Sequence, residues 1–156
     1  MIELASQGIN IVLYKPEIPA NTGNIGRLCV GTNSILQLIK PFRFFLDDKS
    51  LKRAGLDYWQ NLNIKIWDNF DDLTGSIQKS SFYLCTTKTN KSYLNVKFSP
   101  GDYLIFGPES SGLPNEMLGA YPDYCITIPM SPKIRSINLS NSVAVILYEA
   151  IRQINS

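Results

Sequence analysis

Short apolar runs alternate along this chain with segments whose apolar residues recur at three- and four-residue steps. Runs with the length of a buried strand cover residues 10–14, 35–39, 64–67, 81–85, 102–106 and 125–128. Helical spacing covers about 22–32, 46–54, 68–79 and 139–154. This alternation predicts an α/β fold in which a mostly parallel sheet is flanked by helices through right-handed crossovers. With no repeat or low-complexity linker, we expect a single domain at residues 9–156 after an N-terminal extension at residues 1–8.

The C-terminal segment shows the sharpest change of pattern. Two prolines after residue 128 prevent a regular strand, so residues 129–138 must form a shaped loop. From Leu139 to Ile154 the apolar positions follow the period of an amphipathic helix, for which Ser136 or Asn138 is the expected N-cap. The first turn, residues 140–142, is small and polar, which lets another backbone or a ligand approach it closely.

Composition excludes several kinds of chemistry. The chain has no histidine and no CxxC pair, which removes histidine-based triads and makes a metal site unexpected. Its three cysteines are isolated among apolar or small residues, as is typical of reduced, buried thiols. Neither a membrane span nor a signal peptide is recognisable, and we expect a cytoplasmic protein. The net charge of +2 is too balanced to indicate nucleic-acid binding without local clustering.

In a parallel sheet, ligands bind beyond the carboxyl ends of the strands. The loops at 16–27, 107–114 and 129–138, and the segment 86–88, all follow predicted strands. The first lacks the G-x-G-x-x-G pattern of a dinucleotide site, and the second lacks the Lys-Ser/Thr of a P-loop. Glu109 also occupies the position at which a nucleophile elbow has serine. The usual devices for binding NAD or ATP and for acyl transfer are therefore missing.

Three longer stretches contain these loops: PEIPANTGNIGRLC at 16–29, DYLIFGPESSGLP at 102–114 and IPMSPKIRSINLSNSVAVILYEAIRQ at 128–153. Together they resemble the signature of the SPOUT class of S-adenosylmethionine-dependent RNA methyltransferases. The likeness is closest to the small single-domain members that methylate the ribose 2′-hydroxyl of the wobble nucleotide (34, C or U) of tRNA. A fourth block, LDDKSLKRAGLDYW at 46–59, is typical of that subgroup.

The resemblance implies a C-terminal trefoil knot and a cofactor pocket lined by the knotted loops. Gly107 and Gly112 would let the backbone approach the adenosine without a Cβ, and an apolar slot would hold its adenine ring. Cys85 is smaller than the leucine that the family often has there, which slightly loosens the fit. The residues expected to bind S-adenosyl-L-methionine are Cys85, Thr86, Gly107, Glu109, Gly112, Ile128, Met130, Ser136, Asn138 and Leu139.

Methyl transfer from a sulfonium needs alignment and stabilisation of the developing alkoxide rather than a metal or a nucleophilic side chain. The resemblance assigns that role to Arg27, whose guanidinium stays protonated and would pair with a phosphate and stabilise negative charge. Asn24 and Glu109 are its expected helpers, together with Asn138. Tyr148 on the C-terminal helix would either reach the active site of a neighbouring subunit or serve as an interface tyrosine.

Basic residues near these loops are the expected contacts to the anticodon arm of tRNA: Lys15, Arg43, Lys52, Arg53, Lys133 and Arg135. One subunit supplies few of them for useful affinity, and the resemblance implies a homodimer formed through the C-terminal helix. Two alternatives remain open. One is a SPOUT ribose methyltransferase that acts on another tRNA or rRNA position, and the other is a non-catalytic dimer that binds an adenosine ligand or RNA.

Overall fold

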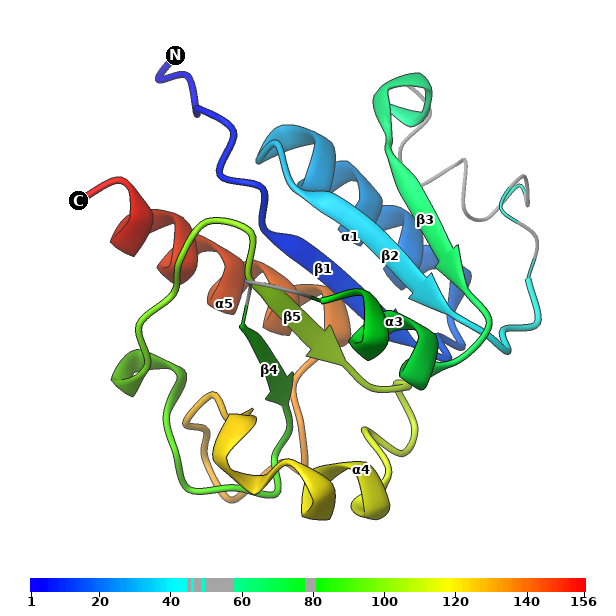
Figure 1. Ribbon diagram of the computed structural model, residues 1–156, viewed down its shortest axis with the longest axis vertical. Helices are drawn as coiled ribbons and strands as arrows, with labels where there is room; N and C mark the ends of the chain where they lie inside the picture. The colour runs from blue at the N-terminus through cyan, green and yellow to red at the C-terminus, as the bar shows by residue number, and fades with distance from the viewer. Residues whose placement is uncertain (45, 47–48, 50–57, 78–80) are drawn as a thin grey trace.

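Six parallel strands form one sheet in the computed structural model, which describes residues 1–44, 46, 49, 58–77 and 81–156 (Figure 1). The strand order is β3-β2-β1-β5-β4-β6, so the chain leaves β1 toward one edge and later returns to build the other. The α/β prediction with a mostly parallel sheet is therefore confirmed. The strands are β1 Asn10–Tyr14, β2 Ile35–Ile39, β3 Ile64–Trp67, β4 Phe82–Cys85, β5 Tyr103–Phe106 and β6 Cys125–Ile126.

The helices are α1 Pro19–Gly31, α3 Phe70–Ser76, α4 Asn115–Ala120 and α5 Leu139–Ile154, with short 3-10 turns at Trp59–Asn61, Tyr93–Asn95 and Pro122–Tyr124. Helix α5 has the predicted bounds, and its N-cap is Asn138, whose side chain accepts from the N–H groups of Ser140 and Asn141. The helix predicted at 46–54 falls mostly outside the described residues. None of the helices in the described part of the chain has the length and apolarity needed to cross a membrane.

Helix α1 begins earlier than the sequence indicates. Its polar residues Asn21 and Thr22 are the N-caps that local pattern favours, but the observed N-cap is Ile18, with Pro19 at the first helical position. Proline is well suited there because it has no N–H that would need a partner. The Ile18 side chain cannot cap the helix, so its start has no side-chain cap of its own.

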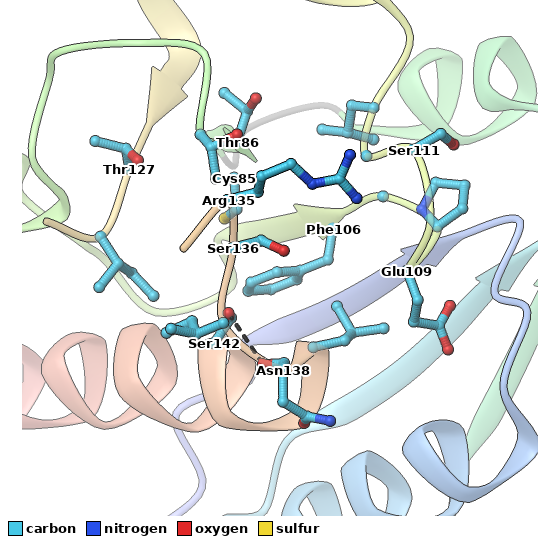
Figure 2. Close-up of a pocket in the computed structure, with 18 of the residues that line it drawn as sticks. Cys85, Thr86, Phe106, Glu109, Ser111, Thr127, Arg135, Ser136, Asn138 and Ser142 are labelled. Carbon is cyan, nitrogen blue, oxygen red and sulfur yellow. Dashed lines mark hydrogen bonds between the residues drawn. The ribbon is translucent and has the colours of Figure 1, made fainter. Parts of the chain in front are cut away.

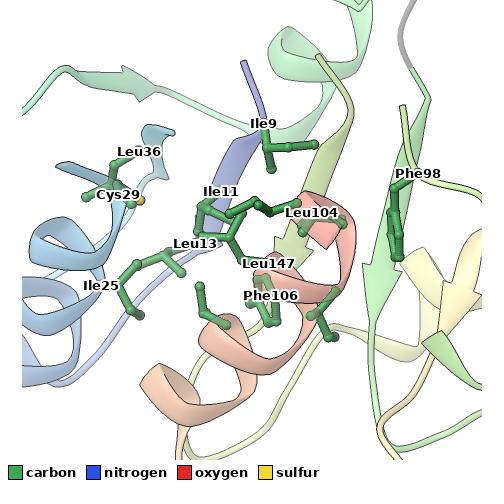
Figure 3. Close-up of a cluster of buried hydrophobic side chains, with 14 of the residues drawn as sticks. Ile9, Ile11, Leu13, Ile25, Cys29, Leu36, Phe98, Leu104, Phe106 and Leu147 are labelled. Atoms are coloured by element: carbon green, nitrogen blue, oxygen red, sulfur yellow. The ribbon is translucent and has the colours of Figure 1, made fainter. Parts of the chain in front are cut away.

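Alternate residues of β1 face the two layers of the core, as the period of a strand requires. Ile11 and Leu13 pack with buried residues of α1 and α5 on one face (Figure 3). Val12 packs with the cluster on the opposite face, which includes Leu73 of α3. Strands covered on both faces are the expected form of a parallel sheet. The sheet thus fixes the positions at which its carboxyl-end loops meet.

The N-terminal segment packs against the domain at its far end. The buried side chain of Gln7 donates to the carbonyl of Thr32 at 2.8 Å, and the side chain of Asn33 donates to the carbonyl of Leu4 at 2.6 Å. Leu4 also packs against the core cluster of α1 and α5. Part of the predicted extension is therefore folded onto the turn between α1 and β2, away from the carboxyl ends of the strands.

Candidate cofactor and catalytic site

A cavity of about 530 Å³ lies at the carboxyl ends of three neighbouring strands (Figure 2). Cys85, Phe106 and Ile126 are the last residues of β4, β5 and β6, and each lines this cavity. The start of α5 closes one side with Leu139, Ser142 and Ile146. All residues predicted to bind the cofactor line the same cavity: Cys85, Thr86, Gly107, Glu109, Gly112, Ile128, Met130, Ser136, Asn138 and Leu139.

The lining suits a flat heterocycle joined to a polar chain. Apolar side chains make up much of the wall, namely those of Phe106, Ile126, Ile128, Leu139 and Ile146. Within the described residues, the main-chain N–H and C=O groups of Ile128, Met130 and Ser136 form no hydrogen bond with the protein. Such groups can read the edge of an adenine ring, and the volume is in the range usual for cofactor pockets, about 300–1,000 Å³. The residues present therefore fit an adenosine-containing cofactor.

The two glycines of the β5–α4 loop are needed for different reasons. A Cβ on Gly107 would lie 2.3 Å from the backbone of both Gly112 and Leu113, so the loop itself fills the space. The loop backbone therefore leaves no space for a side chain at residue 107, and the close approach of the Gly107 backbone to an adenosine stays a prediction. Gly112 has a φ of +69° with open space where a Cβ would be, and its N–H donates to the carbonyl of Pro108 at 2.8 Å. Glycine is favoured there by its backbone conformation.

Glu109 joins this loop to the start of α1. Its carboxylate accepts the N–H groups of Glu17 at 2.9 Å and Ile18 at 2.8 Å, and the side-chain amide of Asn21 at 3.2 Å. These two N–H groups belong to the N-cap residue and the residue before it, so Glu109 makes from a distance the contact that the glutamate of a capping box makes locally, and its negative charge suits the positive end of the helix dipole. Glu109 was predicted as a helper in catalysis, whereas these contacts give it the position of a clamp between the two motif loops.

A reciprocal contact strengthens this clamp. The carboxylate of Glu17 accepts the backbone N–H of Ser110 at 2.8 Å and the Ser110 hydroxyl at 2.7 Å. These two hydrogen bonds, and less strongly the positive charge of Arg43, lower the pKa of Glu17 below its ordinary value. Arg43 therefore lies close enough to Glu17 for its charge to act on that carboxylate, and its contact with RNA stays a prediction.

Asn21 connects the first motif to the third. Its side-chain oxygen accepts from the Asn138 amide at 3.2 Å and from the Ser140 hydroxyl at 3.4 Å, and Asn21 itself lines the cavity. Together, the polar side chains of Glu109, Asn21 and Asn138 link all three motifs. The prediction named Asn24, which is exposed and outside the lining. Asn21 shares the buried side of α1 with Ile25, four residues on, a pattern that could have identified it.

Arg27 and Tyr148 do not line the cavity. Arg27 lies on the exposed face of α1, one turn beyond Asn24. Tyr148 is 50% exposed on α5, and Val145 of the same helix is 38% exposed. The structure of a single chain thus does not bring the predicted catalytic residues Arg27, Asn24 and Tyr148 into the cavity with Glu109.

The predicted RNA contacts are distributed around the site. Arg135 lines the cavity, and Figure 2 shows its side chain reaching across toward Ser111. Lys133 lies on the same exposed loop. Lys15 follows β1 and holds its ammonium 5.0 Å from the Tyr14 ring centroid. Lys52 and Arg53 fall outside the described residues.

The cysteines are unsuited to nucleophilic chemistry. Burial raises the pKa of Cys29 to about 12 and also raises the pKa of Cys85, which lines the cavity. A thiol of that kind stays protonated at neutral pH and is unreactive. Among the residues that the structure describes, no group of three His, Cys, Asp or Glu side chains could hold a metal ion.

Comparisons with known proteins agree with this geometry. The sequence profile of the SpoU rRNA Methylase family matches residues 8–148. A tRNA (cytidine(34)-2′-O)-methyltransferase of Aeromonas hydrophila is 48% identical over 147 residues, covering 94% of each chain. A solved structure from work on 2-OH methylation of C/U34 on tRNA has a TM-score of 0.87 and 40% identity, covering 93% of this chain and 95% of that one.

A more distant structure shares the fold. The SpoU methyltransferase AviRb of Streptomyces viridochromogenes, solved in complex with the cofactor AdoMet, has a TM-score of 0.81 at 22% identity. The alignment covers 97% of this chain and 60% of AviRb. At that identity the likeness concerns the arrangement of strands and helices alone.

Proposed function

Since the chain belongs to the SpoU rRNA methylase family, we propose that it transfers a methyl group from S-adenosylmethionine to the ribose 2′-hydroxyl of nucleotide 34, C or U, in tRNA. The relative that matches over 94% of both chains bears the name of this activity for cytidine 34. The single observation that carries the proposal at the site is the cavity in which all three motifs meet. A tRNA substrate would place the reaction in the cytoplasm.

The cofactor would occupy the cavity beyond β4, β5 and β6. Ile128, Met130 and Leu139 would hold its adenine ring, whose edge their main-chain groups can bind. Ser136 and Asn138 would contact its polar part. S-adenosylmethionine supplies an electrophilic methyl group, so the protein needs no nucleophile of its own. The chain's contribution is then to align the ribose oxygen and to exclude water around it.

Arg27 would stabilise the negative charge that develops on the ribose oxygen and would pair with an adjacent phosphate. Its guanidinium remains protonated, so it is not itself the base. The clamp from Glu109 to Glu17 and Ile18 fixes the start of the helix that carries Arg27. Glu109 would therefore act by holding this helix in place, and Asn21 and Asn138 would hold the opposite wall.

The active unit would be a homodimer formed through α5. Val145 and Tyr148 give that helix an exposed apolar strip outside the face that packs on the sheet, which is the kind of surface that a partner covers. Pairing would bring Tyr148 of one subunit toward the other subunit's cavity and would unite two sets of RNA contacts, including Lys15, Arg43 and Arg135. A trefoil knot formed by the C-terminal segment belongs to the same proposal.

Methyl transfer to a defined tRNA position tests the proposal directly. Purified protein is incubated with methyl-labelled S-adenosylmethionine and either native tRNA or a synthetic anticodon stem-loop, and the label is mapped by nuclease digestion. A matched stem-loop with 2′-deoxyribose at position 34 lacks only the acceptor oxygen and should take up no label. Methyl on a base, on another ribose or on the deoxy substrate would overturn the substrate assignment.

The role of Arg27 is tested in the same assay. Arg27→Ala should abolish turnover while S-adenosylmethionine binding stays near the wild-type level, because charge stabilisation acts in the transition state. Lys65→Ala removes a positive charge from the edge strand β3, where Lys65 lies over the Trp67 ring, and should leave kcat unchanged.

The proposed dimer is tested by analytical ultracentrifugation. Sedimentation of a fully active monomer would refute it.

A further inference from the structure

Tyr58 packs into the surface of α1. The residue is only 7% exposed, and its hydroxyl donates a hydrogen bond to the carbonyl of Gly23. A Cβ on Gly26 would lie 3.2 Å from the Tyr58 hydroxyl oxygen and 3.3 Å from Cε2. The phenol therefore fills a space that exists because residue 26 is glycine, and it contacts two successive turns of the helix.

The carbonyl that accepts the Tyr58 hydroxyl, that of Gly23, is also the expected helical acceptor for the backbone N–H of Arg27. In an α-helix the C=O of residue 23 accepts the N–H of residue 27, and α1 includes both. Burial raises the pKa of the Tyr58 phenol, against the smaller opposing effects of the Arg27 backbone N–H and the Arg27 positive charge. The phenol oxygen thus lies beside the Arg27 backbone and keeps its proton at neutral pH.

Helix α1 is held by contacts from two distant parts of the chain. Glu109 binds the N–H groups of the two residues that precede the helix, Glu17 and Ile18. Tyr58 binds the second turn of the helix at Gly23. The Arg27 side chain lies on the exposed face of the helix. Its place relative to the cavity is therefore set by where the helix backbone is held.

We propose that Tyr58 is a positioning residue for Arg27: its hydroxyl holds the backbone turn from which the guanidinium extends. The inference rests on the proposed function, in which Arg27 stabilises the developing charge. It adds a residue outside the cavity lining that acts on the reaction through another. Tyr58 belongs to the sequence block at 46–59 that is typical of the subgroup, and the proposal gives this residue of the block a role.

Tyr58→Phe removes the hydroxyl and keeps the ring that packs against Gly26. We expect kcat to fall roughly 10- to 100-fold, the scale on which small misplacements of an aligned group act. KM for tRNA and the affinity for S-adenosylmethionine should stay within about twofold of wild type, because Tyr58 does not line the cavity.

Tyr83→Phe is the matched control. The Tyr83 hydroxyl also donates to a backbone carbonyl, that of Lys97 at 3.0 Å, and burial also raises its pKa. Tyr83 belongs to β4, and the carbonyl that its hydroxyl binds lies outside α1. A general loss of stability from a missing tyrosine hydroxyl would affect both variants, whereas loss of kcat should occur only with Tyr58→Phe.

Gly26→Ala provides a second, independent variant. The added methyl group would press on the phenol and on Leu62 Cδ2, 3.0 Å away, and should displace the same contact from the helix side. We expect the same loss of kcat with unchanged cofactor affinity. This variant keeps the proposal testable if Tyr58→Phe folds poorly.

Two measurements separate this inference from the proposed function. Amide hydrogen exchange at Arg27 should become roughly fivefold faster or more in Tyr58→Phe, and this readout needs no methyl transfer. In an Arg27→Lys background, which should retain partial activity, adding Tyr58→Phe should change kcat by less than about twofold, because the group it positions is already altered.

Unchanged exchange at Arg27, or a kcat loss of equal size with and without the Arg27 guanidinium, would overturn the positioning role. If the wild-type protein does not methylate position 34 but exchange at Arg27 still responds to Tyr58→Phe, the proposed substrate fails and the structural relationship stands.

Discussion

Oε2 of Glu109 accepts the backbone N–H of Ile18 at 2.8 Å, across 91 residues of sequence. Ile18 is the N-cap residue of α1 and has no side-chain group with which to cap it. The loop after β5 therefore supplies the acceptor for the N-cap N–H that a glutamate at the third helical position supplies locally in a capping box. Because α1 carries Arg27, this contact ties the position of a proposed catalytic group to a loop of the cofactor cavity.

Glu109→Gln should weaken both the helix start and the reaction. The amide keeps one acceptor but turns donors toward backbone N–H groups, and we expect the free energy of unfolding to fall by about 1 kcal/mol, the net value of one hydrogen bond. The kcat should fall because α1 shifts. Glu116→Gln is the control, since Glu116 is exposed in the first turn of α4. Equal stability of the two variants in urea denaturation would contradict the clamp.

Substitutions at the two loop glycines should have different effects. Gly107→Ala places a methyl group 2.3 Å from backbone atoms of Gly112 and Leu113, so the loop must distort. Both the melting temperature and the affinity for the cofactor should drop sharply. Gly112→Ala meets open space, and its cost is the positive φ, roughly 1–2 kcal/mol. Thermal melts and calorimetry with S-adenosylmethionine test both variants, and a Gly107→Ala protein with wild-type melting would exclude the close backbone packing.

Glu149 should contribute stability that depends on acid pH. Hydrogen bonds from Arg152 and then Gln153 lower the pKa of its carboxyl to about 2, from an ordinary value of 4.5. A pKa lowered in the folded state means that the contribution is complete above pH 4.5 and is lost as pH falls toward 2. The melting temperature of wild type should therefore exceed that of Glu149→Gln at neutral pH.

The difference should shrink across that acid window. Glu3→Gln, at an exposed position in the N-terminal segment, is the control and should show no comparable change. A difference between wild type and Glu149→Gln that is constant from pH 7 to pH 2 would be inconsistent with the lowered pKa.

The cysteines should resist alkylation in the native protein. Burial raises the pKa of Cys29 to about 12 and raises the pKa values of Cys85 and Cys125 as well, so little thiolate is present at pH 8. Mass spectrometry after iodoacetamide treatment should find the folded protein almost unmodified and the urea-unfolded protein modified at all three cysteines. Rapid modification of native Cys85 would show that its side of the cavity opens to solvent.

The local sequence pattern predicted those helices and strands that can be recognised from the period and length of their own apolar residues. The strands and α5 follow from period and length, and Asn138 was one of two predicted caps for α5. The start of α1 was predicted wrongly because the residues before it are held by Glu109, which no local window of sequence contains. The place of Asn21 in the site could not be predicted for a related reason, since the partners of its side chain are Glu109, Asn138 and Ser140. The role expected for Asn24 stays a prediction.

The cavity was predicted more fully than the polar network that shapes it. The resemblance assigned the loops, and every residue predicted to bind the cofactor lines one cavity. The closeness of Gly107 to Leu113 and the contact of Tyr58 with Gly23 depend on how distant segments approach in space. No spacing within the chain encodes such distances, so these relationships emerge only from the folded protein.

The placement of β6 and α5 has a consequence for how the protein is made. β6 pairs with β4 at the edge of the sheet, and the wall from Ile126 to Ile146 closes the cavity. A ribosome delivers the chain from its N-terminus at about 5–20 residues per second, so the first five strands leave the exit tunnel before this wall exists. During that interval the apolar side chains of β1 and β5 that later pack in one cluster with Leu147 of α5 remain exposed. Chaperone capture would therefore be most productive late in translation, just before the closing helix emerges.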